Sequence, residues 1–369
     1  MRLLHFADLH LDTPFRWADR EQARKRRRAL RDTLLRICQV ANEQNVDALT
    51  CGGDLYEQDR FTPDTAEFLR ATFDEIAPLP VFLVPGNHDW FGPESLYRQV
   101  QWSPNVHVFD TAEFTAVTLA DGLTLWGAAH CAPANTPNFL DTFYVDRGGV
   151  HIALFHGSAQ GDLWMQQQGK VPHAPFRTEQ IQQAGLRHAL LGHFHHPIDA
   201  SDHTYPGNPD PLSFGETWTG AAVLVTVADD GAIARERFTV ATSVVRDVQV
   251  DLTGVAHEGQ VRQKVLDAVA DLSGYVRVTL CGALGPNVDV RLQDFGQLCP
   301  PHLDALVVQF GSLRVALSED YELLAKEQTV RGQFVRDVIA ADLTDDQRRR
   351  VLVTGLRALN DRVDELEVH

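Results

Sequence analysis

Val81-Phe82-Leu83-Val84-Pro85-Gly86-Asn87-His88-Asp89 is the stretch from which the fold of this chain can be worked out. Its apolar first half predicts a short buried strand, because a continuous apolar run of this length is typical of a strand covered on both faces. The strand pattern ends abruptly in Gly86–Asp89, four residues of types that are common in catalytic and metal-binding sites. We therefore interpret Gly86–Asp89 as the centre of an active site.

The same pattern recurs along the chain. Three other segments consist of a short, largely apolar run that ends in Asp or His: Leu3–Ala7 before Asp8-Leu9-His10, Val46–Cys51 before Gly52-Gly53-Asp54, and Ala189–Leu191 before Gly192-His193-Phe194-His195. A further strand pattern over 151–155 precedes His156. Such repetition is hard to obtain by chance, so we interpret these strand-end side chains as parts of one site.

Alternating strand and helix patterns over residues 1 to about 90 predict an α/β fold built from βαβ units with a parallel sheet. From about residue 105 the strands become short and alternating, the first of them over 106–109, which predicts a second, partly antiparallel sheet. A hairpin with strands over 222–227 and 234–240 is expected to close the first domain near residue 240.

The domain organisation follows from these patterns and from the length of 369 residues, which is too long for one typical core. We expect a large domain over 1–243, a small α+β domain over 244–316 and a helical segment over 317–369. Thr344–Gln347 reads as a capping box that opens the last amphipathic helix. The apolar faces of this segment need a covering surface, which either their own domain or a partner protein supplies.

The composition, with 44% apolar and 22% charged residues, is that of a soluble globular protein, and we expect it to be cytoplasmic. The sequence contains neither a signal-peptide pattern nor an apolar run long enough to span a membrane. Five scattered cysteines without a C-x-x-C pair are expected to be reduced. A formal net charge of −17 excludes a protein that coats nucleic acid through bulk electrostatics, although clustered divalent cations would reverse the field locally.

The strand-end residues form a set of oxygen and imidazole donors without a thiolate: Asp8, His10, Asp54, Asn87, His88, His156, His193 and His195. Such a set favours Mn²⁺, Fe²⁺ or Zn²⁺ over a closed structural zinc site. Seven of these residues as ligands would be too many for one metal with its water, but they suit two metals that share a carboxylate. Asp54 is the expected bridge because a carboxylate has two oxygens.

These residues, in this order, resemble the D-x-H, G-D, G-N-H-D and G-H-x-H pattern of the calcineurin-like metallophosphoesterases. The resemblance implies a two-sheet α/β/β/α sandwich. It also implies that one metal is held by Asp8, His10, Asp54 and His195, and the other by Asp54, Asn87, His156 and His193. His88 would face the substrate as a general acid or transition-state stabiliser, and Asp89 would orient it.

Tyr205–Pro209 and Ser213-Phe214-Gly215-Glu216 make the chain similar to the SbcD-type DNA-repair nucleases, and within them to the YhaO-like subgroup. The resemblance implies a DNA exonuclease of 3′-to-5′ polarity with single-strand endonuclease activity, two metal ions with Mn²⁺ favoured over Fe²⁺, Zn²⁺ or Mg²⁺, a capping domain over 244–316, and a homodimer bound to an SbcC-type coiled-coil ATPase. Gly53-Asp54 continues as Leu55-Tyr56-Glu57, without the histidine of some relatives, so no DNA-contacting residue is assigned.

Two other functions remain open: a phosphatase or cyclic-nucleotide phosphodiesterase for small or protein substrates, and a non-catalytic scaffold of an ATPase. Phosphatases of the family generally need no appended domain, and a scaffold would have lost at least one ligand residue. The basic run Arg24–Arg28 either tracks a DNA backbone or forms the solvated surface of the first helix. We favour the solvated surface, since five consecutive cations surround a helix.

Overall fold

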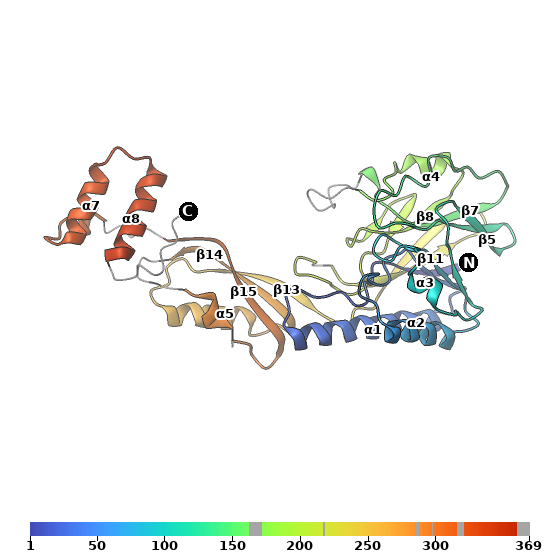
Figure 1. Cartoon of the computed structure of the whole chain (residues 1–369), viewed down its shortest axis with the longest axis horizontal. Coiled ribbons are helices and arrows are strands. Elements are labelled where there is room, and N and C mark those ends of the chain that lie inside the picture. The colour runs from blue at the N-terminus through green and yellow to red at the C-terminus, as the bar shows by residue number, and fades with distance from the viewer. Residues whose placement is uncertain are drawn as a thin grey trace. The chain divides into compact units, whose positions relative to one another are not determined.

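The structure is a computed structural model that describes residues 1–161, 172–216, 218–284, 288, 290–296, 298–315 and 321–359. The chain divides into two compact units, Met1–Val245 and Arg246–His369. Figure 1 labels many of the helices and strands of the two units.

The first sheet of the first unit has six strands in the order β12-β11-β1-β2-β3-β4. Their bounds are β1 Arg2–Phe6, β2 Ala48–Cys51, β3 Val81–Leu83, β4 Val106–Val108, β11 Ala221–Val227 and β12 Ile233–Thr239. Strands β1 to β4 are parallel, and β11 is antiparallel to both β1 and β12. The predicted βαβ units and the predicted hairpin are thus confirmed, and the hairpin extends the first sheet.

The second sheet also has six strands, in the order β5-β6-β7-β8-β10-β9. Their bounds are β5 Thr115–Ala120, β6 Leu123–Gly127, β7 Val150–His156, β8 His188–Gly192, β9 Ile198–Asp199 and β10 His203–Tyr205. Strands β6, β7, β8 and β10 run parallel, whereas β5 and β9 pair antiparallel at the two edges. The prediction of a partly antiparallel second sheet is confirmed.

One strand differs from the prediction. The segment 106–109 was expected to open the second sheet, but β4 pairs in parallel with β3 and forms the edge of the first. Its residues are exposed or half-buried, as is usual for an edge strand with one open side. An edge strand has an alternating pattern whichever sheet it joins, so the pattern could not identify its neighbour.

The outer face of the first sheet is covered by α1 (Arg20–Glu43) and α2 (Pro63–Glu75) (Figure 1). Helix α1 begins at Asp19, whose carboxylate accepts a hydrogen bond from the Gln22 N–H. Its side chains at helical spacing, Leu30 and Leu34 among them, are fully buried against the sheet. A short helix, α3 (Leu96–Gln99), follows β3.

The two sheets pack face to face. Leu3 and Val223 of the first sheet and Leu125 and Leu154 of the second belong to one buried cluster between them. The outer face of the second sheet carries α4 (Glu179–Gln183), whose Ile181 is buried against that face. The layers are therefore helix, sheet, sheet and helix, which confirms the α/β/β/α sandwich.

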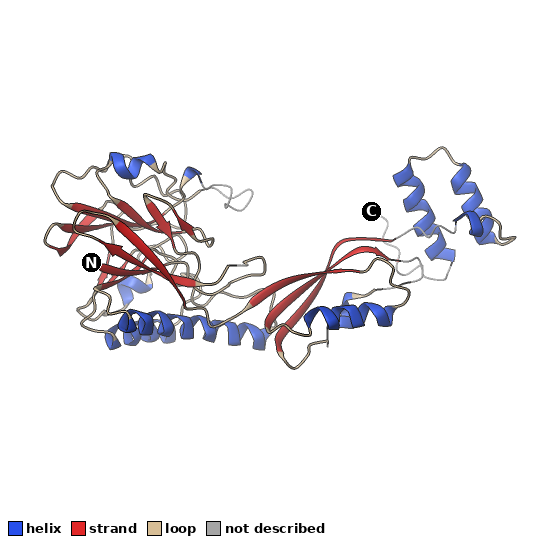
Figure 2. Cartoon of the chain, turned by 180° about the vertical axis from the view of Figure 1, so that it is seen from behind, coloured by secondary structure: helices blue, strands red, loops and turns tan. Residues whose placement is uncertain are grey.

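The second unit contains a three-stranded sheet of β13 (Val245–Asp251), β14 (Gly274–Leu284) and β15 (Leu303–Val315), drawn in red in Figure 2. Strands β14 and β15 are parallel. Helix α5 (Glu258–Val269) buries Val261, Val265 and Val269 against this sheet, and a short 3₁₀ helix, η2, covers Leu292–Phe295. This part of the chain is therefore an α+β arrangement with a core of its own.

Three helices follow: α6 (Tyr321–Leu324), α7 (Val330–Ala340) and α8 (Asp345–Leu359). The predicted capping box is present, since Thr344 and Gln347 exchange hydrogen bonds of 3.0 and 3.3 Å between side chain and backbone. Residues 317–320 and 360–369 of the predicted C-terminal segment lie outside the described residues. Within the described part of the chain, no helix has the length and apolar character of a membrane span.

His5 links the two sheets from the fully buried interior. Its Nδ1 lies 3.0 Å from the Thr50 hydroxyl of the first sheet, and its Nε2 lies 3.0 Å from the Leu191 carbonyl of the second. Because a carbonyl only accepts, Nε2 carries the proton of the neutral ring. Burial lowers the pKa of His5 to about 4.

We predict that acid destabilises the metal-free protein partly through His5. The unfolded chain binds a proton at His5 near pH 6.5 and the folded chain only near pH 4, so stability from this group is lost as pH falls through that window. The full loss is about 3 kcal/mol. The measurement is the free energy of unfolding by urea at pH 7 and at pH 4.5. In His5→Gln the decrease between these two pH values becomes smaller; an unchanged decrease would contradict the assignment.

Candidate active site

The carboxyl ends of five strands meet at one edge of the sandwich. In the first sheet β1, β2 and β3 are parallel neighbours, and Asp8, Asp54 and Asn87 follow them. In the second sheet β7 ends in His156, and the parallel β8 precedes His193 and His195. The structure therefore brings together all seven residues that the sequence predicts as ligands.

Two glycines allow the two sheets to approach each other at this edge. A Cβ on Gly192 would collide with the Gly52 carbonyl oxygen, and a Cβ on Gly52 would lie 2.9 Å from the Gly192 nitrogen. Both contacts are shorter than side chains tolerate. The backbone contact between β2 and β8 therefore requires glycine on both strands, and it places the histidines of the second sheet over the carboxylates of the first.

Several of these residues have a left-handed backbone, which L-residues other than glycine rarely adopt. The φ angles are 56° at Asp8, 51° at His10, 53° at Asp54 and 117° at His193. Such strained conformations concentrate at functional sites, because the surrounding structure holds them in place. Four of the predicted ligands therefore lie on backbone that the surrounding structure constrains.

One half of the cluster surrounds the Nε2 atom of His156. This atom lies 3.0 Å from Asn87 Oδ1, 3.3 Å from His193 Nδ1 and 3.4 Å from Asp54 Oδ2. The other ring nitrogen, Nδ1, lies 2.9 Å from the Gly52 carbonyl and carries the proton of the neutral ring. Burial lowers the pKa of His156 to about 3, so Nε2 presents a lone pair to two oxygen acceptors.

The other half is built on His10 and His195. The Nδ1 of His10 lies 2.8 Å from Glu57 Oε1, and the Nδ1 of His195 lies 3.2 Å from Glu216 Oε1. Ligand atoms of Asp8, His10 and His195 lie within 4.8 Å of one another. The Nε2 of His10 is buried, has no hydrogen-bond partner and lies 3.6 Å from Asp54 Oδ2.

Asp54 faces both halves. Its Oδ2 is the oxygen near His10 and His156, whereas its Oδ1 accepts a hydrogen bond of 2.8 Å from the His88 N–H. Burial acts to raise the pKa of Asp54, but the charges of His156, His88 and His10 outweigh it, so this pKa lies well below its usual range. Asp54 is therefore an anion between two groups of imidazoles.

This donor set fits divalent cations. Around His156 Nε2, lone pairs of imidazole, amide and carboxylate converge, an arrangement that a cation would stabilise. The buried, unpartnered Nε2 of His10 is the clearest sign, since a buried polar atom costs free energy unless something binds it. Three rings are also oriented from behind by Gly52, Glu57 and Glu216, as is usual for histidines that bind metals.

His88 lies beside the cluster and is open to solvent, with 43% of its side chain exposed. Its Nδ1 lies 3.1 Å from Glu57 Oε2, and its ring meets that of His10 edge to face at 4.8 Å between centroids. Partial burial of the ring acts to lower the pKa of His88. The negative charges of Asp54 and Glu57 outweigh this effect and raise the pKa to about 9. Without metal, His88 is thus a protonated imidazolium at neutral pH.

The expectation that Asp89 orients the His88 ring differs from the structure. The fully buried Asp89 carboxylate accepts hydrogen bonds from the N–H groups of Asp54, Leu55 and Gly86, at 3.1, 2.7 and 2.6 Å. It also accepts one from the Tyr97 hydroxyl at 2.6 Å. Asp89 therefore ties together the two loops that carry Asp54 and His88. Among the described residues, the carboxylate that contacts the His88 ring is that of Glu57.

Glu57 and Glu216 are the site residues that sequence reasoning missed. Glu57 bridges His10 and His88 through its two oxygens. Glu216 binds His195 and also accepts hydrogen bonds from Asn208 and from the Leu212 N–H, at 2.6 and 2.7 Å. Both lie within the quoted segments, but a carboxylate behind a histidine has no spacing rule, because the two side chains meet only in the folded chain.

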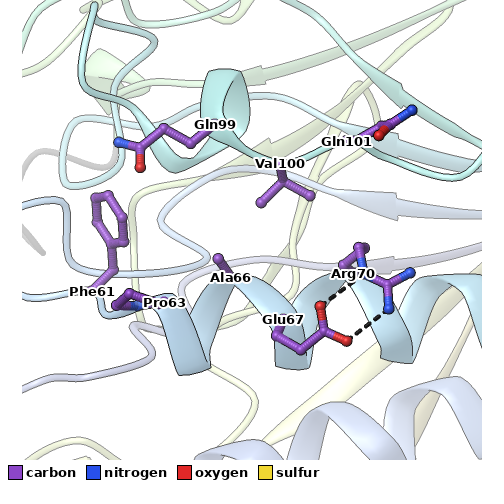
Figure 3. A pocket seen from close by; sticks show the side chains of 8 residues that line it. All are labelled: Phe61, Pro63, Ala66, Glu67, Arg70, Gln99, Val100 and Gln101. Carbon is purple, nitrogen blue, oxygen red and sulfur yellow. Dashed lines mark hydrogen bonds and ion pairs between the residues drawn. The ribbon is translucent and has the colours of Figure 1, made fainter.

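A cavity of about 780 Å³ opens above the cluster. Its floor contains His10, Asp54, Glu57, Asn87, His88, His193 and His195, and part of its wall is aromatic, with Phe15, Trp17, Phe214 and Trp218. A second hollow of about 320 Å³ lies between α2 and α3 (Figure 3). There Glu67 and Arg70 pair with each other at 2.7 Å, so both charges of its described lining are engaged. The first cavity is therefore the candidate active site.

The basic run on α1 is only partly the solvated surface that the sequence predicts. Arg24, Lys25 and Arg28 are exposed, but Arg26 is fully buried and pairs with the equally buried Asp210 at 2.8 Å. The prediction is wrong for Arg26. Its partner lies 184 residues away along the chain, so composition could not reveal the pair.

We predict that Asp89→Ala destabilises the metal-free protein by about 3 kcal/mol or more, because it leaves three buried N–H groups without an acceptor. Tyr97→Phe, which removes one hydroxyl donor and keeps the ring, should cost about 1 kcal/mol. The measurement is the free energy of unfolding in urea. Equal stabilities of Asp89→Ala and Tyr97→Phe would show that Asp89 does not hold the two loops.

Comparisons with known proteins agree with this geometry. The chain is 25% identical over 286 residues, 74% of its length and 68% of the other chain, to the uncharacterised metallophosphoesterase YhaO of Bacillus subtilis. It is similar to proteins named DNA double-strand break repair protein Mre11 from two archaea. That of Methanopyrus kandleri is 28% identical, over 58% of this chain and 50% of its own length, and that of Haloferax volcanii is 26% identical, over 99% and 76%.

The family comparison covers the part of the chain that builds the site. The model of the calcineurin-like phosphoesterase family matches residues 1–197, which include every predicted ligand. Among solved structures, TT1561 of Thermus thermophilus aligns over 65% of this chain and 98% of its own, with a TM-score of 0.40 and 15% identity. Because the family model matches residues 1–197, more than half of the chain, the chain belongs to the calcineurin-like phosphoesterases.

Proposed function

We propose that the protein is a DNA nuclease of the SbcD type that hydrolyses phosphodiester bonds in DNA repair or end processing with two divalent cations. The observation that carries the proposal is the convergence of seven donor residues on two adjacent points, with Asp54 between them. The similarity to the two proteins named Mre11 supports DNA as the substrate. The cavity above the cluster has a volume of about 780 Å³.

Asp8, His10, Asp54 and His195 would hold one cation, and Asp54, Asn87, His156 and His193 the other. We propose Mn²⁺, because carboxylate and amide oxygens mixed with imidazoles suit it well. Two such cations, when bound, neutralise charge on the phosphodiester and lower the pKa of a neighbouring water. The buried anion Asp54 makes this edge of the sandwich attractive to cations and unattractive to a phosphate alone.

His88 supplies the proton at the leaving oxygen. Its Nδ1 is engaged by Glu57, so Nε2 is the nitrogen that remains for the substrate. The charges of Asp54 and Glu57 keep the ring protonated, and nearby cations act in the opposite direction, which moves its pKa from about 9 towards neutrality. A pKa near the working pH is the most useful value for a general acid.

Glu57 and Asp89 position the acid and the bridge. Glu57 joins His10 and His88 through its two oxygens, so the ring of the acid and a ligand ring are held by one carboxylate. Asp89 holds the backbone of the two loops that carry Asp54 and His88. The carboxylate of Asp54 also accepts a hydrogen bond from the His88 N–H. The distance between the cation site and the proton donor is therefore set by buried hydrogen bonds.

The proposal includes a partner, an SbcC-type ATPase, and a homodimer. The support from the chain is a set of exposed apolar side chains: Val330, Ile339 and Val351 of α7 and α8 are 75%, 44% and 39% exposed. Apolar side chains at such positions are suited to burial against another protein. Analytical ultracentrifugation of the purified chain, alone and mixed with a coiled-coil ATPase of the SbcC type, tests both parts.

We predict that the metal-free protein binds two Mn²⁺ ions and that Asp54→Ala weakens both, because Asp54 faces both halves of the cluster. His195→Ala should lower the affinity for one ion at least tenfold and leave the affinity for the other unchanged. Isothermal titration calorimetry measures the stoichiometry and affinities, with the exposed Asp59→Ala as the control. Loss of a single ion in Asp54→Ala would contradict the bridging role.

We predict that His88→Ala keeps both Mn²⁺ ions and lowers the rate of DNA cleavage by about 10²- to 10⁴-fold, since it removes the general acid. The assay compares linear double-stranded DNA, single-stranded DNA and bis(p-nitrophenyl) phosphate. The control is His257→Ala, an exposed histidine of the second unit. Equal cleavage by His88→Ala and wild type refutes the role of His88. Hydrolysis of the small diester without any cleavage of DNA refutes the nuclease proposal and favours a small-molecule phosphodiesterase.

A further inference from the structure

The active-site cavity has a second chemical character that phosphodiester hydrolysis does not use. Phe15, Trp17 and Phe214 line the same cavity as the donor cluster. The ring centroids of Trp17 and Phe214 lie 4.7 Å apart at an interplanar angle of 58°, and those of Phe15 and Trp17 lie 6.0 Å apart at 82°. The three rings form one contiguous surface, called here the aromatic wall.

The aromatic wall is held from behind. The Trp17 indole N–H donates to the Leu212 carbonyl at 3.2 Å, which ties the loop before α1 to the loop that carries Phe214. Phe15 is 3% exposed, and the Arg26 guanidinium lies 5.0 Å from its ring centroid. Arg26 in turn pairs with Asp210, and both side chains are fully buried.

Asp210 is anchored by several further groups. It accepts hydrogen bonds from the Thr33 hydroxyl at 2.9 Å and from the N–H groups of Thr242 and Ser243 at 2.8 and 3.0 Å. A buried ion pair with this many partners is rigid. The wall is therefore pre-organised, whereas Trp17 and Phe214 themselves are only half-buried and face the cavity.

The floor of the cavity and the aromatic wall are suited to different parts of one ligand. The floor, with its anions and imidazoles, accepts a phosphate once cations are bound. The wall offers flat π-faces, and the exposed Arg16 at its edge is suited to a second phosphate. A ligand that combines phosphates with flat rings and can enter one cavity of about 780 Å³ is a strand of nucleotides.

We propose that the aromatic wall is a nucleobase subsite in which Trp17 and Phe214 stack on an unpaired base next to the scissile phosphodiester. The inference rests on the proposed nuclease function and deepens it. A base inside a duplex is covered on both faces by its neighbours, so the wall reaches only bases that are single-stranded, frayed or flipped. The structure thereby assigns two residues to substrate positioning that belong to neither the cation site nor the proton donor.

The experiment uses single-stranded oligonucleotides in which one nucleotide at a time is replaced by an abasic analogue. Single-turnover cleavage with Mn²⁺ is measured at each phosphodiester. In the wild-type protein, an abasic nucleotide next to the scissile bond should slow cleavage there about tenfold, because a stacked base is lost. In Phe214→Leu and in Trp17→Leu, which keep an apolar side chain without its ring, the ratio between intact and abasic substrate should fall to about twofold or less.

Two controls make the result specific. Tyr144→Ala removes an aromatic ring that is 71% exposed and outside the cavity lining, and it should keep the wild-type ratio. Phe214→Tyr keeps an aromatic face and should also keep that ratio. Thermal melting and Mn²⁺ binding verify that each variant is folded, and if Trp17→Leu does not fold, Phe214→Leu alone decides.

The outcomes separate the two proposals. If the wild-type protein hydrolyses methyl p-nitrophenyl phosphate but no oligonucleotide, the nuclease function fails and the subsite fails with it. If oligonucleotides are cleaved and the abasic position has no effect, or if Phe214→Leu keeps the wild-type ratio, the subsite alone is overturned and the nuclease function stands. The nucleobase subsite is supported if the ratio between intact and abasic substrate falls in Phe214→Leu and keeps its wild-type value in Tyr144→Ala.

Discussion

The close approach of β2 and β8 at Gly52 and Gly192 is the constraint on which the rest of the site depends. The carboxylates of Asp8 and Asp54 come from the first sheet, and His156, His193 and His195 come from the second. They face one another only because the two strand ends touch through backbone atoms. A side chain on either glycine would separate the layers at that edge, and neither sheet alone holds enough donors for two cations.

The cost of this arrangement is electrostatic and conformational. Buried carboxylates and neutral imidazoles whose lone pairs point at one another are unfavourable in a low-dielectric interior unless a cation or proton lies between them. The left-handed backbone at Asp8, His10 and Asp54 adds strain. The fold compensates for both through hydrogen bonds beneath the cluster, among them the four that Asp89 accepts.

Much of the fold and of the site could be predicted from the sequence. The features that could not be predicted have one physical cause in common. A strand followed by Asp or His is a local pattern, so the parallel strands and the set of clustered residues were predicted; their assignment as ligands stays a prediction. Glu57, Glu216 and the burial of Arg26 were missed. Glu57 contacts His10 across 47 residues and Asp210 contacts Arg26 across 184, and no periodicity connects such positions.

By itself the sequence determined the identity and order of the reactive side chains and the strand ends that carry them, because apolar runs and turn residues act within a few positions. Only the tertiary structure decided what lies behind each side chain: Glu57 behind His88 where Asp89 was expected, the edge on which β4 pairs, and the aromatic rings beside the donor cluster. These are contacts between segments distant in the chain. Their geometry follows from how two sheets and their loops pack, which no local pattern encodes.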